Sequence, residues 1–123
     1  MSLRKKLIAA GLLTCRTAVV AERAKFRCEY CKLDLLASAA AYRQWEFDHI
    51  VPRTCDGTDD VDNMACACMI CNRVKNRFDP REVLGSKYTR ADAIRVATDY
   101  IQAQHEATTR HYVSKYRSII QEG

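Results

Sequence analysis

The apolar positions of the chain change from helical spacing to alternation and then back to helical spacing. Residues 3–13 and 17–25 place apolar side chains on one helical face and predict two short helices. Residues 42–50 alternate aromatic and polar side chains, as a half-buried strand does, and a second strand is predicted over 63–68. We therefore expect helices before a small pair of strands.

Helical spacing returns after the second predicted strand. Residues 71–78 predict a helix that stops before Pro80, because the residue preceding a proline avoids helical backbone angles. Thr89 begins the sequence TRAD, a capping box, and apolar residues then recur at helical spacing over 94–119. We expect one long helix, broken near Thr108, which either packs on the core or offers a surface for a homodimer.

This order of elements predicts an α+β fold. Two strands and one helix form a small core, flanked by N-terminal helices and a long C-terminal helical region. A chain of 123 residues suits a single domain over 1–123. Within it we expect the core at 17–80 and a helical C-terminal extension at 81–123.

Two CxxC pairs carry the first chemical signal. Cys28 with Cys31 and Cys68 with Cys71 supply the four thiolates that tetrahedral zinc prefers. The 36 residues between the pairs exceed the roughly 15 to 20 of common zinc modules, so the site encloses an inserted segment. Cys66 is a rival ligand, but the CxxC spacing favours Cys68. The remaining thiols, Cys15 and Cys55, are expected to be free.

The number and spacing of the cysteines also indicate the cellular compartment of the protein. Seven cysteines, four of them in zinc spacing, fit a reducing cytoplasm better than a disulfide framework. Arg4, Lys5 and Lys6 precede a short apolar run and so imitate a signal peptide, but Thr14 stands where lipidation favours a smaller residue. We expect a cytoplasmic or phage-encoded intracellular protein with no membrane partner, since no stretch approaches a membrane span.

The inserted segment contains the residues suited to hydrolysing a phosphodiester. His49 can take a proton from water near pH 7. Asp48 and the amide oxygen of Asn72 can bind a hard cation such as Mg²⁺ or Mn²⁺. Asn63, at the start of the second strand, is expected to position the imidazole. Successive side chains of a strand face opposite ways, so Asp48 and His49 can share a target only if the backbone is irregular over 48–53.

Charge is distributed to suit a nucleic acid. The net charge is +5, and basic segments at 1–27 and 73–90 flank an acidic segment at 46–62. We expect Arg53 and Lys75 to contact DNA phosphates. For Arg73 and Arg77, phosphate contact and simple solvation are equally favoured. The acidic residues Asp56, Asp59 and Asp60 are expected to form a solvated loop.

These residues together resemble a known family. The segment DHIVP at 48–52, Asn63, and CMICNRVK at 68–75 strongly resemble the HNH nucleases, whose fold is the ββα-metal or His-Me finger. The resemblance covers about residues 17–80. It implies that His49 is the general base, that Asp48 and Asn72 bind the catalytic ion and that the four cysteines bind a structural zinc. The third letter of the motif is Asn72 in place of histidine, a variant that the family also uses.

The leading hypothesis is an HNH-type endonuclease that cuts or nicks DNA with one divalent metal ion. The alternative is a non-catalytic zinc module that binds nucleic acid, in which Asp48, His49 and Asn72 are structural. All three of these polar residues are present together, which favours the enzyme. Residues 81–123 contain no motif for base recognition.

Overall fold

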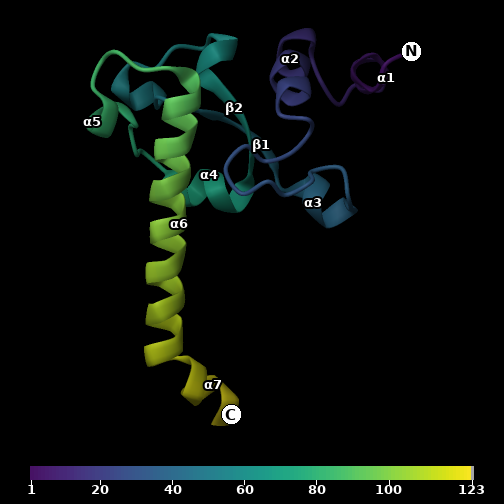
Figure 1. Ribbon diagram of the computed structural model, residues 1–123. Coiled ribbons are helices and arrows are strands. Elements are labelled where there is room, and N and C mark those ends of the chain that lie inside the picture. The colour runs from purple at the N-terminus through teal and green to yellow at the C-terminus, as the bar shows by residue number, and fades with distance from the viewer. Residues whose placement is uncertain (123) are drawn as a thin grey trace.

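The fold is α+β, as predicted, with a two-stranded sheet among helices (Figure 1). The computed structural model describes residues 1–122. Its elements are α1 (Leu3–Ala9), α2 (Cys15–Arg23), α3 (Ala39–Arg43), β1 (Trp45–His49), β2 (Met64–Cys68), α4 (Met69–Lys75), α5 (Arg81–Leu84), α6 (Arg90–Lys115) and α7 (Arg117–Glu122), with single 3-10 turns at Arg53–Cys55 and Val61–Asn63.

Strands β1 and β2 form an antiparallel hairpin whose pairing runs from Trp45 opposite Cys68 to His49 opposite Met64. Irregular backbone was expected from residue 48, but the pairing is regular through His49 and the chain leaves the strand at Ile50. The expected start of β1 at residue 42 was also wrong. Tyr42 lies in α3, because the Ser38 hydroxyl accepts a hydrogen bond from the Ala41 N–H and so caps that helix.

Strand β2 lies at the centre of the core. Helix α2 packs against β2, and α4, which follows β2 directly, packs back against both strands. All side chains from Ala65 to Cys68 are buried. Their small size lets the neighbouring elements approach closely, so β1, β2 and α4 form a compact ββα unit.

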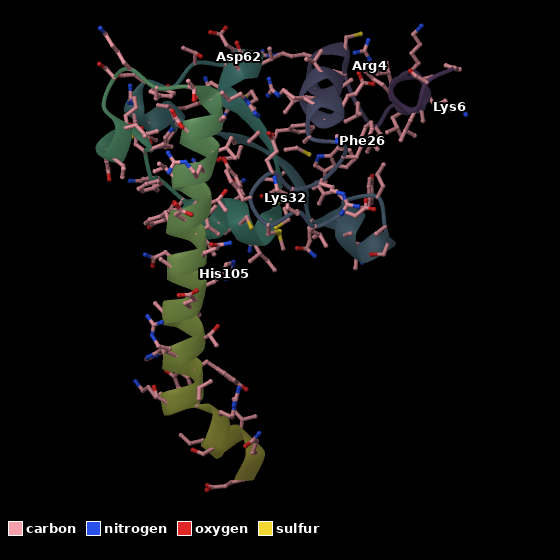
Figure 2. All side chains as sticks on the ribbon, in the orientation of Figure 1. Arg4, Lys6, Phe26, Lys32, Asp62 and His105 are labelled. Atoms are coloured by element: carbon pink, nitrogen blue, oxygen red, sulfur yellow. The ribbon has the colours of Figure 1, made fainter. Side chains whose placement is uncertain are left out.

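Helix α6 has a buried first half and an exposed second half. Thr89 caps its start, as predicted, and Ala93, Val96, Ala97 and Ile101 are buried. Figure 2 shows the side chains beyond His105 standing away from the rest of the molecule. The break expected near Thr108 was wrong, because the helix continues to Lys115.

The far half of α6 and α7 exposes several large apolar side chains. They are Tyr112, Val113, Tyr116, Ile119 and Ile120. A homodimer through this region stays a prediction. Within residues 1–122, no helix has both the length and the apolar character needed to cross a membrane.

Candidate metal centre and active site

The two CxxC pairs meet in space. The sulfur atoms of Cys28, Cys31, Cys68 and Cys71 all lie within 4.8 Å of one another, and those of Cys31 and Cys68 are 3.7 Å apart. A tetrahedral zinc ion with bonds of about 2.3 Å needs sulfur atoms about 3.8 Å apart. The four cysteines can therefore hold a metal ion such as zinc, as the sequence predicted.

Each pair is built as a tight turn. The Cys31 N–H donates to the Cys28 sulfur, and the Cys71 N–H donates to the Cys68 sulfur, both at 3.4 Å. Cys68 is also the cap of α4, so the second turn is the first turn of that helix. Because β2 and α4 meet at this turn, a metal bound there joins the hairpin to the helix.

Glu29 attaches the first turn to β2. Its backbone N–H donates to the Cys66 carbonyl at 2.8 Å, and its carboxylate accepts the Cys66 N–H at 2.9 Å. The same carboxylate accepts a hydrogen bond from the Arg90 guanidinium at 2.8 Å, which links the first cysteine turn to the start of α6. The first cysteine pair is thus fixed to the strand that leads to the second.

The four thiols need a cation in order to ionise together. Sulfur hydrogen bonds from Cys68 and Cys71 lower the pKa of Cys28, whereas the hydrogen bond to Cys28 raises the pKa of Cys68 to about 11. The pKa of Cys71 is raised for the same reason. One thiolate at this site therefore opposes the ionisation of the other thiols. The positive charge of a divalent cation would offset that repulsion.

Cys66 lies outside this cluster, so the choice of Cys68 is confirmed. Its thiol is completely buried, and burial raises the pKa of Cys66 to about 12. Cys15 and Cys55 are free thiols, also as predicted.

A cleft of about 260 Å³ lies beside the hairpin and α4. It brings together Asp48, His49 and Asn72, the three residues to which the sequence assigned the base and the catalytic cation. The residues that complete its lining are Phe47, Pro52, Arg53, Thr54, Asn76 and Arg77.

Asp48 lines the cleft, and one of its carboxylate oxygens is held by groups of the core. The side chain is nearly buried, and its Oδ2 accepts the Tyr30 hydroxyl at 2.6 Å and lies 3.1 Å from the Lys75 ammonium. Oδ1 receives no hydrogen bond from the described residues. Burial raises the pKa of Asp48, against the opposing effect of Lys75, so a cation at Oδ1 would favour its ionised form.

Asn72 is oriented by a residue that the sequence reasoning missed. The Asn72 side-chain N–H donates to the Glu46 carboxylate at 2.9 Å, which sets the plane of the amide. Glu46 precedes Asp48 by two residues on β1, so both lie on the strand face that meets α4. This alternation was the signal that could have identified Glu46.

His49 lies at the end of β1 with about a quarter of its side chain exposed. Its Nε2 lies 2.8 Å from an Asp59 carboxylate oxygen, and Arg53 Nε lies 3.7 Å from the same oxygen. This hydrogen bond from His49 is the main reason that the pKa of Asp59 is lowered. Asp59 is exposed in the loop, as expected, and its carboxylate also contacts His49, a partner that the sequence did not predict.

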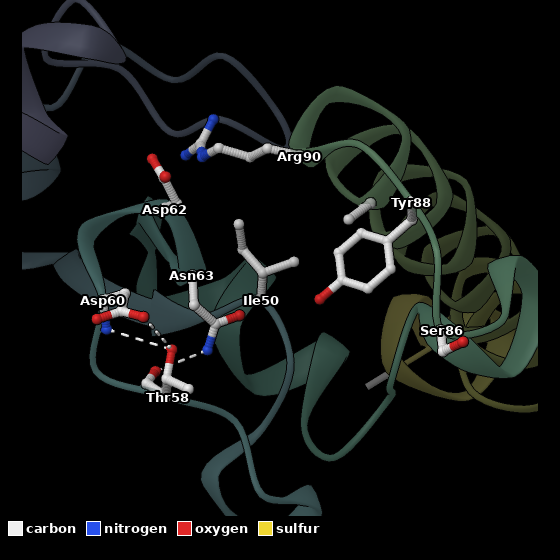
Figure 3. A pocket seen from close by; sticks show the side chains of 9 residues that line it. Ile50, Thr58, Asp60, Asp62, Asn63, Ser86, Tyr88 and Arg90 are labelled. Atoms are coloured by element: carbon white, nitrogen blue, oxygen red, sulfur yellow. Dashed lines mark hydrogen bonds between the residues drawn. The ribbon is translucent and has the colours of Figure 1, made fainter.

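Asn63 holds the loop that carries Asp59. Its amide donates to the carbonyls of Val51 and Thr58 and accepts the Val51 N–H, and its own carbonyl accepts the Ile50 N–H at 2.8 Å. Figure 3 shows the amide directed at Thr58. Asn63 thus fixes the backbone that follows His49 and does not contact the imidazole itself.

The basic residues fall into two groups. Arg53 and Arg77 are exposed and line the cleft, whereas Arg73 is exposed outside its lining. Lys75 has no exposed side-chain surface, and its ammonium pairs with Asp48 and donates to the His49 carbonyl at 2.9 Å. A buried, paired ammonium cannot reach a phosphate, so the role expected for Lys75 is corrected to one of support.

A larger cavity of about 520 Å³ is lined in part by Asn63. Its lining includes Asp60, Asp62, Tyr88 and Arg90 but none of the three residues assigned to the base and the cation (Figure 3). The smaller cleft is therefore the candidate active site.

Comparison with known proteins agrees with the resemblance read from the motifs. Residues 28–78 match the HNH endonuclease family. This HNH segment includes all four cysteines, both strands and α4, and it omits α6 and α7. No curated protein matches the chain.

The cysteine site predicts a strong dependence of folding on zinc. Replacing Cys28 with serine, or chelating the metal, should unfold the HNH segment, because the free energy of metal binding is largely folding free energy. Circular dichroism and bound zinc are the measurements. Cys15→Ser is the matched control and should retain both, since Cys15 is exposed and outside the cluster. Native circular dichroism in metal-free protein would contradict the structural role.

The buried pair predicts that Asp48 supports the fold as well as the cleft. Asp48→Ala leaves the Lys75 ammonium buried without its carboxylate, which should lower the free energy of unfolding by about 3–5 kcal/mol. The double variant Asp48→Ala/Lys75→Met should recover most of that loss in denaturant titrations of the zinc-loaded protein. Asp62→Ala, at an 88 % exposed side chain, should change stability by less than about 1 kcal/mol. Equal stability of Asp48→Ala and the unsubstituted protein would contradict the pairing.

Proposed function

We propose that this protein is a metal-dependent HNH-type endonuclease that hydrolyses phosphodiester bonds in DNA, by nicking or by double-strand cleavage. The observation that supports this most directly is the cleft lined by His49, Asp48 and Asn72 together with two exposed arginines. The match of residues 28–78 to the HNH endonuclease family supports the same activity.

His49 is the proposed general base, and Asp59 sets its tautomer. An ionised carboxylate can only accept a hydrogen bond, so the proton between the two residues belongs to Nε2 of His49. A neutral imidazole protonated at Nε2 has its free lone pair on Nδ1. Nδ1 receives no hydrogen bond from the described residues, so it is the atom proposed to take a proton from the attacking water.

Asp48 and Asn72 would hold the catalytic Mg²⁺ or Mn²⁺ ion. Asp48 offers Oδ1, and Asn72 offers its amide oxygen, since its N–H is engaged with Glu46. Two protein oxygens suit an ion that keeps water and phosphate oxygens as its other ligands. When bound, such an ion supplies positive charge to the phosphate and to the leaving oxygen.

Arg53 and Arg77 are proposed to contact the DNA backbone. Both are exposed at the cleft that contains His49, where their charge would attract and orient phosphates. Arg73, exposed on α4, would add to the attraction without lining the cleft. Free thiols around a metal-type cysteine cluster fit a cytoplasmic site of action in this proposal.

The proposal predicts loss of cleavage on removing the base. In plasmid nicking with Mg²⁺ or Mn²⁺, His49→Ala should be about 10² to 10⁴ times slower than the unsubstituted protein, the usual contribution of a positioned general base. His105→Ala is the matched control and should retain full activity, because His105 lies on α6 away from the cleft. Equal cleavage by His49→Ala would remove His49 from the mechanism. No cleavage by the unsubstituted protein would favour a zinc module that only binds nucleic acid.

The role given to Asp59 predicts a rate effect without a large effect on binding. Asp59→Ala should lower kcat by about tenfold, as expected for a residue that orients a functional imidazole, and should leave KM for DNA within about threefold. Asp62→Ala removes the same charge from the same loop region and should leave kcat unchanged. A higher kcat in Asp59→Ala would mean that the carboxylate blocks the base instead of orienting it.

A further inference from the structure

Tyr30 joins the two functional parts of the molecule. It lies between Cys28 and Cys31, inside the first metal-binding turn, and its ring is buried with 3 % of its surface exposed. Its hydroxyl donates to Asp48 Oδ2 at 2.6 Å. One side chain therefore connects the loop held by the sulfur atoms to a residue of the candidate active site.

Lys75 makes the second connection to the same oxygen. It is the last residue of α4, the helix that begins beside Cys68 and includes Cys71. Its ammonium lies 3.1 Å from Asp48 Oδ2 and donates to the His49 carbonyl at 2.9 Å. The first cysteine turn and the helix that begins at the second turn thus each supply one of the groups that hold Asp48.

The shared target is the inner oxygen of the carboxylate. With a neutral hydroxyl and a charged ammonium both at Oδ2, the carboxylate cannot turn over without breaking two buried interactions. Oδ1 receives no hydrogen bond from the described residues, so it is the oxygen available to a ligand in the cleft that Asp48 lines. This arrangement favours one-oxygen coordination of a cation and fixes the position of that oxygen before the cation arrives.

We propose that Tyr30 is a positioning residue that couples the four-cysteine site to the divalent-cation site by holding Asp48 so that Oδ1 alone faces the cleft. This inference rests on the proposed function for the assignment of the cation to Asp48 and Asn72. It adds that the first cysteine turn sets the affinity of the cleft for the cation, in addition to stabilising the fold. Tyr30 itself does not contact substrate or cation.

The test is Tyr30→Phe, which removes only the hydroxyl. Mn²⁺ binding to zinc-loaded protein without DNA is measured by calorimetry, and the Kd should rise at least tenfold, in line with the usual effect of removing a group that supports a metal ligand. Bound zinc and circular dichroism should be unchanged, since the cysteines and the ring remain. Tyr42→Phe is the matched control and should leave the Kd unchanged, because Tyr42 is half exposed on α3. A Kd within twofold of the unsubstituted protein in Tyr30→Phe would overturn the proposal.

A measurement on the unsubstituted protein covers the case in which Tyr30→Phe does not fold. In protein with tyrosine labelled by ¹³C at Cζ, the Tyr30 signal should shift during titration with Mg²⁺, following the same binding curve as the calorimetric heat. The shift is expected because a cation at Oδ1 draws charge from the oxygen that accepts the Tyr30 hydroxyl. A Tyr30 signal that stays fixed while Mg²⁺ binds would overturn the proposal.

These readouts separate this inference from the proposed function. Cation binding is measured without DNA, so a raised Kd in Tyr30→Phe would support the coupling even if no variant cleaved DNA. In the opposite case, DNA cleavage with an unchanged Kd in Tyr30→Phe would leave the endonuclease intact and remove Tyr30 from it.

Discussion

The convergence of four cysteine sulfur atoms is the interaction on which the rest of the structure depends. The sheet has only two strands, and such a hairpin is marginally stable in isolation. A metal ion held by the four sulfurs would fix the segment before β1 to the junction of β2 and α4. The ββα unit can then keep its geometry although its core consists largely of alanine and cysteine side chains.

A buried polar network extends this constraint to the cleft. Asp48 and Lys75 are both almost inaccessible to solvent, and a buried ion pair loses much of its Coulomb gain to desolvation. The pair is therefore a weak source of stability but a strong restraint on geometry, because each charge depends on the other. The same network passes through the His49 carbonyl, so the base and the carboxylate are held by one lysine.

Sequence patterns predicted the parts of the structure that depend on spacing. The CxxC pairs identified the four cysteines that can hold a metal ion, and the alternation before His49 identified β1 within a few residues. Thr89 marked the start of α6 because capping is a local interaction. The end of that helix was missed, since nothing between Thr108 and Lys115 breaks a helix and only the tertiary contacts distinguish its two halves.

The roles of charged residues were harder to predict for a physical reason. Lysine and aspartate are exposed by default, so the sequence alone placed Lys75 at the surface in contact with DNA phosphates and Asp59 in a solvated loop. Their actual environments depend on contacts between segments distant in the chain, as in the approach of α4 to Asp48 and of the loop to His49. Tyr30 was missed likewise, because a tyrosine inside a CxxC turn has no pattern that reveals the partner of its hydroxyl.

The central claim is that a sulfur-bound ion places one imidazole and one hard cation at a common cleft. Anomalous diffraction from crystals of the zinc-loaded protein soaked in Mn²⁺ tests this most directly. The account predicts a zinc peak among the four cysteine sulfurs and a manganese peak between the side-chain oxygens of Asp48 and Asn72, with the His49 ring at the same cleft. Manganese bound elsewhere, or an imidazole directed to the other side of the hairpin, would contradict it.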